Sequence, residues 1–263
     1  MRKTKLLVLL VLVLLVMVAL KCCGEKKNID IDEVQLSDTA QSGQEMSSQV
    51  MGKTVIPLNP IKKNEGGGII ITRTKEDGTT EEFLFTDVEA DGWYADAVNY
   101  VVSVGLMNGS EDGPIFLPDY GIQRLEFAIV LYRFAGGTEE GFRHKFSDMQ
   151  TSNWYDKYVA WSTNHGYMNG KEDDSFDPFG YLSCEEALIV LYRLAGEPRP
   201  KGTLEDYPYA PKVSGAGLDA VTWAWNSGLI VEQECVWYPT QTISRAQVAL
   251  LFARYSGMSE NIS

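Results

Sequence analysis

The sequence predicts a mainly α-helical fold made of three tandem repeats, and three observations support that prediction. From Phe85 onward the chain of 263 residues repeats its own pattern with a period of roughly 60 residues. Each repeat contains two stretches with apolar residues at helical spacing, joined by a loop that contains a proline. A glycine follows each second stretch, where helices commonly end in a left-handed residue; these are Gly136, Gly196 and Gly257.

The first two repeats agree landmark by landmark, whereas the third has diverged. The shared landmarks are the openings Phe85-Thr86-Asp87 and Phe146-Ser147-Asp148, the pairs Trp93-Tyr94 and Trp154-Tyr155, and the turns Gly105-Leu106-Met107-Asn108-Gly109 and Gly166-Tyr167-Met168-Asn169-Gly170. The third repeat opens with Glu205-Asp206-Tyr207 and has Ala216 in place of the tryptophan. This order places the repeats at 85–137, 144–197 and 203–258.

Each repeat is expected to fold as helix, loop and helix. In the first repeat the two apolar stripes are Tyr94, Ala97, Val98 and Val101, then Phe127, Val130, Leu131 and Phe134. A unit of two helices cannot bury its stripe alone, so we expect the three repeats to share one core. Deleting the second repeat should therefore unfold the remainder.

A β-hairpin is expected over 67–84, ahead of the repeats. Two runs rich in β-formers, 69–74 and 79–85, flank the dipeptide Asp77-Gly78. A lone hairpin is marginal in water, so this one should pack on the helical domain.

The first 24 residues predict export. A basic start is followed by an unbroken apolar run from Leu6 to Leu20, then by Cys22 and Cys23. A cysteine at this place resembles the lipid-attachment site of bacterial lipoproteins, although Lys21 stands where that site has a small residue. Lipidation at Cys22 or Cys23, a retained membrane anchor and simple cleavage stay open. Each places the chain outside the cytoplasm, in the cell envelope, with 25–66 as a flexible polar spacer.

Composition excludes several classes of function. The formal net charge of −13 opposes unspecific binding to nucleic acid or to an anionic membrane surface, so membrane contact is expected only through the N-terminus. Cys184 and Cys235 lack the paired spacing of a zinc site and are either free thiols or a disulfide. With two histidines and no catalytic constellation, we expect no enzyme, no cofactor and no metal site.

These landmarks together resemble the S-layer homology family, across all three repeats. The family's typical motif at the start of the second helix is Thr-Arg-Ala-Glu. Here the motif is Gln123-Arg124-Leu125-Glu126, Ser183-Cys184-Glu185-Glu186 and Ser244-Arg245-Ala246-Gln247. The resemblance implies a pseudo-threefold bundle that binds a secondary cell-wall polysaccharide, often pyruvylated, in grooves between repeats.

The physics of the motif separates its positions. Ser183 with Glu186, and Ser244 with Gln247, fit capping boxes, so the fourth position is expected to be mainly structural. An arginine beside unsatisfied helix N–H groups could bind a carboxylate, or could bridge to a neighbouring repeat. Cys184 stands where the second repeat should carry its arginine, which puts that groove in doubt.

Other positions have two interpretations each. The aspartates either fix loop geometry or contact sugar hydroxyls, and the tryptophans either stack on sugars or fill the core. The candidate glycan-binding residues are Arg124, Arg245, Asp87, Asp148, Asp206, Trp93, Trp154, Glu126 and Gln247. The alternative function is an envelope scaffold with degenerate repeats, whose partners are other envelope proteins.

Overall fold

The computed structural model describes residues 59–138, 141–150 and 153–258. In this part of the chain six α-helices and a small sheet make a mostly helical structure, which confirms the predicted class. The predicted anchor with Cys22 and Cys23, and most of the predicted spacer, lie outside the described residues. None of the helices described is long and apolar enough to cross a membrane.

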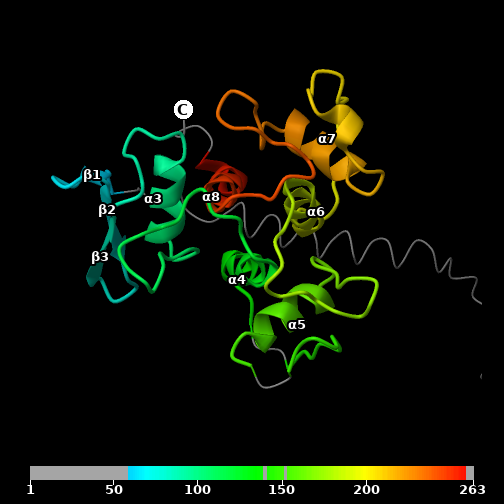
Figure 1. Ribbon diagram of the computed structural model, residues 1–263, viewed down its shortest axis with the longest axis horizontal. Helices are drawn as coiled ribbons and strands as arrows, with labels where there is room; N and C mark the ends of the chain where they lie inside the picture. The colour runs from blue at the N-terminus through cyan, green and yellow to red at the C-terminus, as the bar shows by residue number, and fades with distance from the viewer. Residues whose placement is uncertain (1–58, 139–140, 151–152, 259–263) are drawn as a thin grey trace, which may run out of the picture. The chain divides into compact units, whose positions relative to one another are not determined.

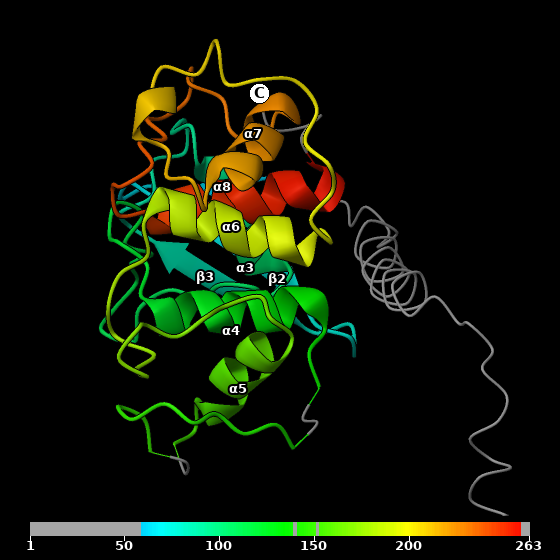
Figure 2. The ribbon, with the colours of Figure 1, turned by 90° about the vertical axis from the view of Figure 1, so that its right-hand side faces the viewer.

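Each predicted repeat contains two helices. In chain order the helices are α3 (Ala95–Ser103), α4 (Arg124–Ala135), α5 (Asp156–Asn164), α6 (Cys184–Leu194), α7 (Leu218–Asn226) and α8 (Arg245–Ala253), with the short turns η1 (Ala210–Lys212) and η2 (Arg254–Met258). The second helices α4, α6 and α8 lie at the centre, end-on in Figure 1 and side by side in Figure 2. Their apolar faces meet in the core, where the rings of Phe127 and Phe252 are 5.7 Å apart.

Helix pairing crosses from one repeat to the next. Helix α5, the first of the second repeat, packs on α4 of the first repeat. Helix α7, the first of the third repeat, packs likewise on α6 of the second. The first helix of all, α3, packs on α8 at the other end of the described chain. The repeats therefore exchange partners in a closed cycle, and no repeat folds its two helices only on each other.

Three backbone hydrogen bonds close the same cycle at the centre. The amide of Ile122 donates to the carbonyl of Ile243 at 3.0 Å, and Ile243 donates to Leu182 at 3.0 Å. Leu182 completes the circle by donating to Ile122 at 3.3 Å. We call these three bonds the central ring. Gly121 lies beside it with no room for a side chain, since an added Cβ would stand 2.5 Å from the Thr242 methyl group.

The start of each second helix is capped by the loop of the next repeat. Arg124, Cys184 and Arg245 donate their amides to the carbonyls of Gly180, Gln241 and Tyr120, each at 2.8 Å. The following amides donate to Pro178, Pro239 and Pro118. The expectation of unsatisfied N–H groups beside the motif arginines is therefore wrong, because neighbouring loops occupy them.

The helix ends match the sequence prediction. Ser183 and Ser244 accept hydrogen bonds from the amides of Glu186 and Gln247, as capping boxes require. Gln123 receives the reciprocal half from Glu126, whose carboxylate accepts its amide at 2.9 Å. Gly136 and Gly196, past α4 and α6, have φ of 67° and 78°, and Gly257, within η2 after α8, has φ of 84°, as expected for left-handed ends.

The sheet extends the predicted hairpin by one strand. Strands β2 (Ile69–Thr74) and β3 (Thr80–Phe85) are antiparallel, and β1 (Lys62–Lys63) pairs with the other edge of β2. The side chains of Ile69 and Ile71 are buried where β2 packs on α3. Strand β1 was not predicted, because two lysines carry no strand pattern.

Candidate functional site

Arg245, the first residue of α8, reaches from the third repeat into the loop of the first. Its Nε donates to the carbonyl of Phe116 at 2.9 Å, and its Nη2 donates to the carbonyl of Asn108 at 2.8 Å. Its Nη1 pairs with the carboxylate of Glu126 at 3.2 Å, and the guanidinium lies over the Phe116 ring. These contacts define what we call the Arg245 junction.

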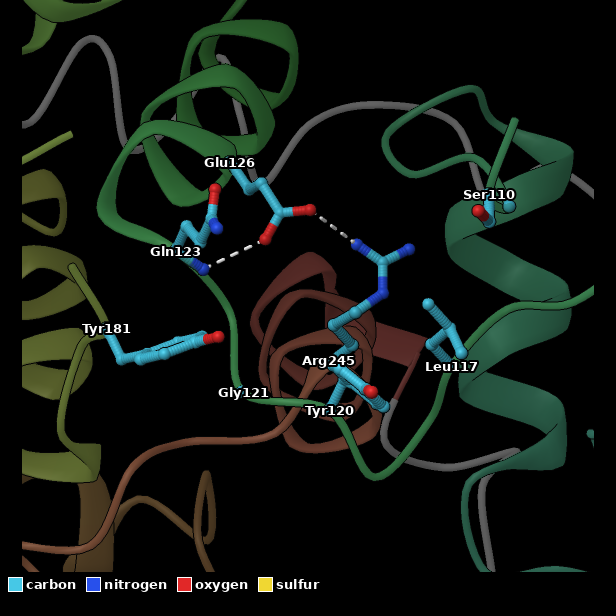
Figure 3. A pocket seen from close by; sticks show the side chains of 9 residues that line it. Ser110, Leu117, Tyr120, Gly121, Gln123, Glu126, Tyr181 and Arg245 are labelled. Carbon is cyan, nitrogen blue, oxygen red and sulfur yellow. Dashed lines mark hydrogen bonds and ion pairs between the residues drawn. The ribbon is translucent and has the colours of Figure 1, made fainter. Parts of the chain in front are cut away.

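A groove of about 230 Å³ opens beside this guanidinium. Three repeats contribute to it: Arg245 comes from the third, Tyr181 from the second and the other residues from the first (Figure 3). It is lined by Gly109, Ser110, Leu117, Tyr120, Gly121, Gln123, Glu126, Tyr181 and Arg245. We call it the Arg245 groove. It combines a cation, a carboxylate, a hydroxyl and an amide with aromatic surface, a set that suits a hydroxyl-rich ligand.

Tyr120 and Tyr181 are the residues of this groove that sequence reasoning missed. Their side chains are 61% and 52% exposed, which is unusual for large aromatic groups. One feature of the sequence could have indicated them: each tyrosine lies in the loop just before a motif helix. Nothing in one sequence showed that the two loops meet, because that contact depends on the cyclic packing.

Arg124 makes the equivalent contacts in the second repeat, but in a more closed setting. Its Nε donates to the carbonyl of Phe176 at 2.7 Å, and its Nη2 to the carbonyl of Asn169 at 2.6 Å. Its side chain is 5% exposed, against 12% for Arg245. Glu186 lies 3.9 Å away and also pairs with Lys171 at 3.6 Å. These contacts define the Arg124 junction.

Burial lowers the pKa of both arginines but leaves them charged near neutral pH. Desolvation lowers the pKa of the Arg124 and Arg245 guanidinium groups, while the nearby carboxylates of Glu186 and Glu126 raise it. Because an arginine starts from so high a value, both groups stay cationic near neutral pH. Arg124 and Arg245 both bridge to a neighbouring repeat, which is one of the two roles predicted for them. Contact with a ligand, the other role, is a proposal.

In the motif of the second repeat Cys184 stands in place of the arginine. Other side chains therefore donate to the loop carbonyls that an arginine would bind. The hydroxyl of Tyr207 donates to the carbonyl of Trp237, and the indole Nε1 of Trp237 donates to Val231 at 3.0 Å. Gln247 donates to the carbonyl of Val236 at 2.8 Å. We call this arrangement the Cys184 junction.

Of the two described thiols, Cys184 is buried and Cys235 is half-buried, and both are unpaired. Cys184 and Cys235 are free cysteines, so the structure shows the free-thiol alternative. Burial, the main cause, raises the pKa of each thiol to about 12. Neither is poised as a nucleophile.

Asp87 and Asp148 fix loop geometry. The carboxylate of Asp87 accepts the amides of Phe116 and Leu117 at 2.8 and 2.7 Å. Asp148 accepts the amides of Phe176 and Asp177 at 2.9 and 2.7 Å. Both carboxylates hold the loop that receives the motif arginine of the preceding repeat in the cycle.

Asp206 does not take the corresponding place. Asp206 is exposed, and in the described part of the chain its carboxylate accepts no loop amides of the kind that Asp87 and Asp148 accept.

The two tryptophans lie away from the lining of the Arg245 groove. Trp93 is half-buried against the core and contacts Tyr94 edge to face at 5.2 Å. Trp154 is 71% exposed and meets Tyr155 and Tyr158. Of the remaining candidates, Glu126 lines the groove and Gln247 is buried in the Cys184 junction. Among the described residues no cluster of His, Cys, Asp or Glu could hold a metal ion.

Comparison with known proteins shows what two of the repeats are similar to. Residues 84–128 and 145–188 match the model of the S-layer homology domain. The cellulosome-anchoring protein of Acetivibrio thermocellus is 31% identical over 121 residues, 44% of this chain and 27% of that protein. The S-layer protein sap of Bacillus anthracis is 25% identical over 181 residues, 65% of this chain and 21% of its own length.

A third relative has the same pattern of coverage. The S-layer protein of Bacillus licheniformis is 28% identical over 173 residues, which are 64% of this chain and 19% of that protein. The matching region thus spans about a quarter or less of each of these relatives. Two of the three predicted repeats therefore match the model of the S-layer homology domain over most of their length, and the diverged third lies outside that match.

Proposed function

From the two S-layer homology segments as a premise, we propose that this chain is a non-catalytic module of the cell envelope that binds a secondary wall polysaccharide. The observation that supports this most is the Arg245 groove, where side chains of all three repeats surround one polar, aromatic-flanked hollow. The names of the relatives, two S-layer proteins and a cellulosome-anchoring protein, support an extracellular location at the cell surface. The cyclic helix pairing supports a pseudo-threefold bundle.

The groove offers two kinds of contact to a sugar chain. Tyr120 and Tyr181 present exposed ring faces on which a sugar ring can stack. Ser110 and Gln123 supply polar groups for hydroxyls. The proposal therefore places the affinity of the uncharged part of the ligand on the two tyrosines, which sequence reasoning had not included.

An acidic substituent, such as a pyruvyl group, is assigned to Arg245. Its Nη1 is 3.2 Å from Oε1 of Glu126, whose side chain is 38% exposed and whose other oxygen accepts the Gln123 amide. A ligand carboxylate that takes over the contact with Nη1 would gain a charge-assisted hydrogen bond. Arg245 is the better candidate than Arg124, because its side chain is the more exposed of the two.

The test is a calorimetric titration with wall polysaccharide fragments, with and without their acidic groups. Tyr181→Ala and Tyr120→Ala should each weaken binding about 2- to 10-fold, in line with a lost aromatic contact of about 0.5–1.5 kcal/mol. Phe179→Ala is the matched control, since Phe179 is 60% exposed and outside the lining of the groove. Arg245→Lys should keep only part of the preference for acidic fragments, since lysine keeps the charge and loses the fork. Equal affinities across these variants would reject the groove.

A protein-interaction scaffold is the second candidate. The observation that favours it is that both motif arginines already serve contacts between repeats, while the remaining motif carries Cys184 in place of the arginine. Sedimentation with wall sacculi, before and after the glycan is stripped, separates the two functions. Sedimentation that survives stripping would favour the scaffold.

We also propose that the N-terminus attaches the module to the membrane through Cys22 or Cys23. Support comes from the apolar run that precedes them. Replacing both cysteines with alanine should release the protein from the membrane fraction if lipid holds it, and should leave it there if the apolar run is retained as an anchor.

A further inference from the structure

A second hollow, of about 390 Å³, lies next to the Arg245 groove. Its walls come from β2, β3 and the 108–114 turn of the first repeat. It is lined by Arg73, Glu81, Glu82, Phe83, Leu84, Phe85, Asn108, Gly109, Ser110, Gly113 and Pro114. We call it the hairpin hollow. Gly109 and Ser110 line both the hollow and the groove, so the two spaces adjoin at these residues.

Arg73 holds the hairpin against the first repeat. Its Nε donates to the carbonyl of Val102 near the end of α3 at 2.6 Å, and its guanidinium lies over the ring of Phe83 at 4.5 Å. A cation at this place also suits the negative end of a helix dipole. The wall of the hollow is thereby fixed to the helical domain.

Asn108 connects the hollow to the groove. Its side-chain oxygen accepts a hydrogen bond from Nη2 of Arg73 at 2.9 Å. Its backbone carbonyl accepts one from Nη2 of Arg245 at 2.8 Å. One residue thus fixes the distance between an arginine of the hairpin and the arginine of the groove.

We infer that the hairpin hollow is a second sugar-binding subsite, which takes the residue next to the one in the Arg245 groove. This inference rests on the proposed function and deepens it. Most of the hairpin precedes the segment that matches the S-layer homology domain, which begins at residue 84. The hairpin is an addition to the repeat pattern, and its position makes it an extension of the binding face.

The chemistry of the hollow suits an uncharged or amino sugar. Glu81 and Glu82 line it as hydrogen-bond acceptors, each already paired with a lysine, Lys75 or Lys62. Two carboxylates disfavour an acidic substituent, so the acidic group of the polymer belongs at Arg245 and not here. Leu84 is 36% exposed and offers an apolar face to a sugar ring.

Arg73 provides a donor. Within the residues that the structure describes, its Nη1 makes no hydrogen bond, while Nε and Nη2 do. A ligand hydroxyl is a suitable acceptor for that nitrogen. Donor, acceptors and apolar surface therefore occur in one hollow of a size that admits a sugar residue.

The test compares ligand length on the full chain. Wall polysaccharide fragments of one repeating unit and of several units are titrated against the parent and against Glu81→Ala/Glu82→Ala. The double variant should bind long fragments about 5- to 10-fold more weakly and short acidic fragments as well as the parent does. Glu172→Ala, an exposed glutamate in the turn of the second repeat, is the matched control and should change neither.

Leu84→Ala is a second variant that keeps every charge, and it should show the same selective loss. Thermal unfolding of each variant confirms that the fold is intact. Equal affinity of parent and both hairpin variants for long fragments would overturn the subsite while leaving the proposed function in place, provided that Tyr181→Ala still weakens binding. A parent that binds no fragment of either length would overturn both.

Discussion

The Arg245 junction and the Cys184 junction use different side chains to donate hydrogen bonds to equivalent loop carbonyls. In the first, a guanidinium from a neighbouring repeat donates to the carbonyls of Phe116 and Asn108. In the second, the carbonyls at the corresponding places belong to Trp237 and Val231. Their donors are the Tyr207 hydroxyl and the Trp237 indole, from within the same repeat.

The difference teaches that the carbonyls are the fixed requirement and the arginine is one way to meet it. A buried carbonyl without a donor costs about 1–3 kcal/mol, so a repeat that loses its arginine must find other donors. The charge partner changes as well. Glu126 and Glu186 accompany the arginines, whereas Gln247 stands where no arginine needs a partner. Arginine and glutamate have been replaced together, and the junction stays neutral.

The largest expected effect on stability is that of removing Arg124, whose guanidinium donates to two carbonyls of the second repeat. Arg124→Met keeps the aliphatic stem and leaves the carbonyls of Phe176 and Asn169 without donors. We expect the free energy of unfolding to fall by about 3 kcal/mol or more, measured by urea denaturation. Cys184→Ala is the control and should cost clearly less. A loss below about 1 kcal/mol for Arg124→Met would show that the guanidinium is dispensable.

Next in size is a charge placed in the neutral junction. Gln247→Glu puts a carboxylate at a residue that is 7% exposed and whose Nε2 donates to the Val236 carbonyl and contacts the Cys235 thiol. We expect a loss of about 2 kcal/mol in unfolding free energy near neutral pH. The mirror change Glu126→Gln, at a half-exposed position, should cost less than about 1 kcal/mol. Similar costs for the two changes would contradict the idea that charge was removed as a pair.

The replacement donor at the Cys184 junction should have a measurable value of its own. Tyr207→Phe removes only the hydroxyl that serves the Trp237 carbonyl, and we expect a cost of about 1–2 kcal/mol. Tyr120→Phe removes a hydroxyl from a side chain that is 61% exposed and should stay within about 0.5 kcal/mol of the parent. Thermal or urea unfolding of the two variants gives the comparison directly. Equal, negligible costs would mean that the hydroxyl is not a substitute for the guanidinium.

One further effect, which is absent near neutral pH, is a dependence on alkaline pH. The pKa of Cys184 and of Cys235 is about 12 in the folded chain, against roughly 8.5 in an unfolded one. Between these values the folded state retains protons that the unfolded state has lost, so the stability contributed below pH 8.5 decreases as pH rises toward 12. A variant with both cysteines changed to alanine should lose less stability over that interval. Parallel pH profiles for variant and parent would contradict the buried, protonated thiols.

Local patterns in the sequence predicted the local structure well. The apolar stripes gave both helices of the first repeat, and Asp77-Gly78 gave the hairpin that β2 and β3 form. Ser183 and Ser244 gave true capping boxes. Each of these depends on neighbours within a few residues, which one sequence displays.

The contacts between repeats were beyond such patterns. The motif arginines were expected beside free amides, yet those amides donate to Gly180 and Tyr120 of other loops. Tyr181 lines a groove with Arg245 only because the second and third repeats meet there. Which loop faces which helix start is decided by the packing of three repeats together, and no spacing along the chain encodes it.

The central ring of Ile122, Leu182 and Ile243 also limits how many repeats this architecture can contain. An open stack of repeats exposes an apolar face at each end and needs special terminal units to cover them, but it can grow or shrink by whole copies. In a closed circle each repeat covers its neighbour, and α3 covers α8, so no terminal unit is needed. A fourth repeat would find every amide and carbonyl of the central ring already paired. With only two repeats, one amide and one carbonyl of the ring would lose their partners. The copy number is therefore set by closure, and the diverged third repeat is retained because the other two require it.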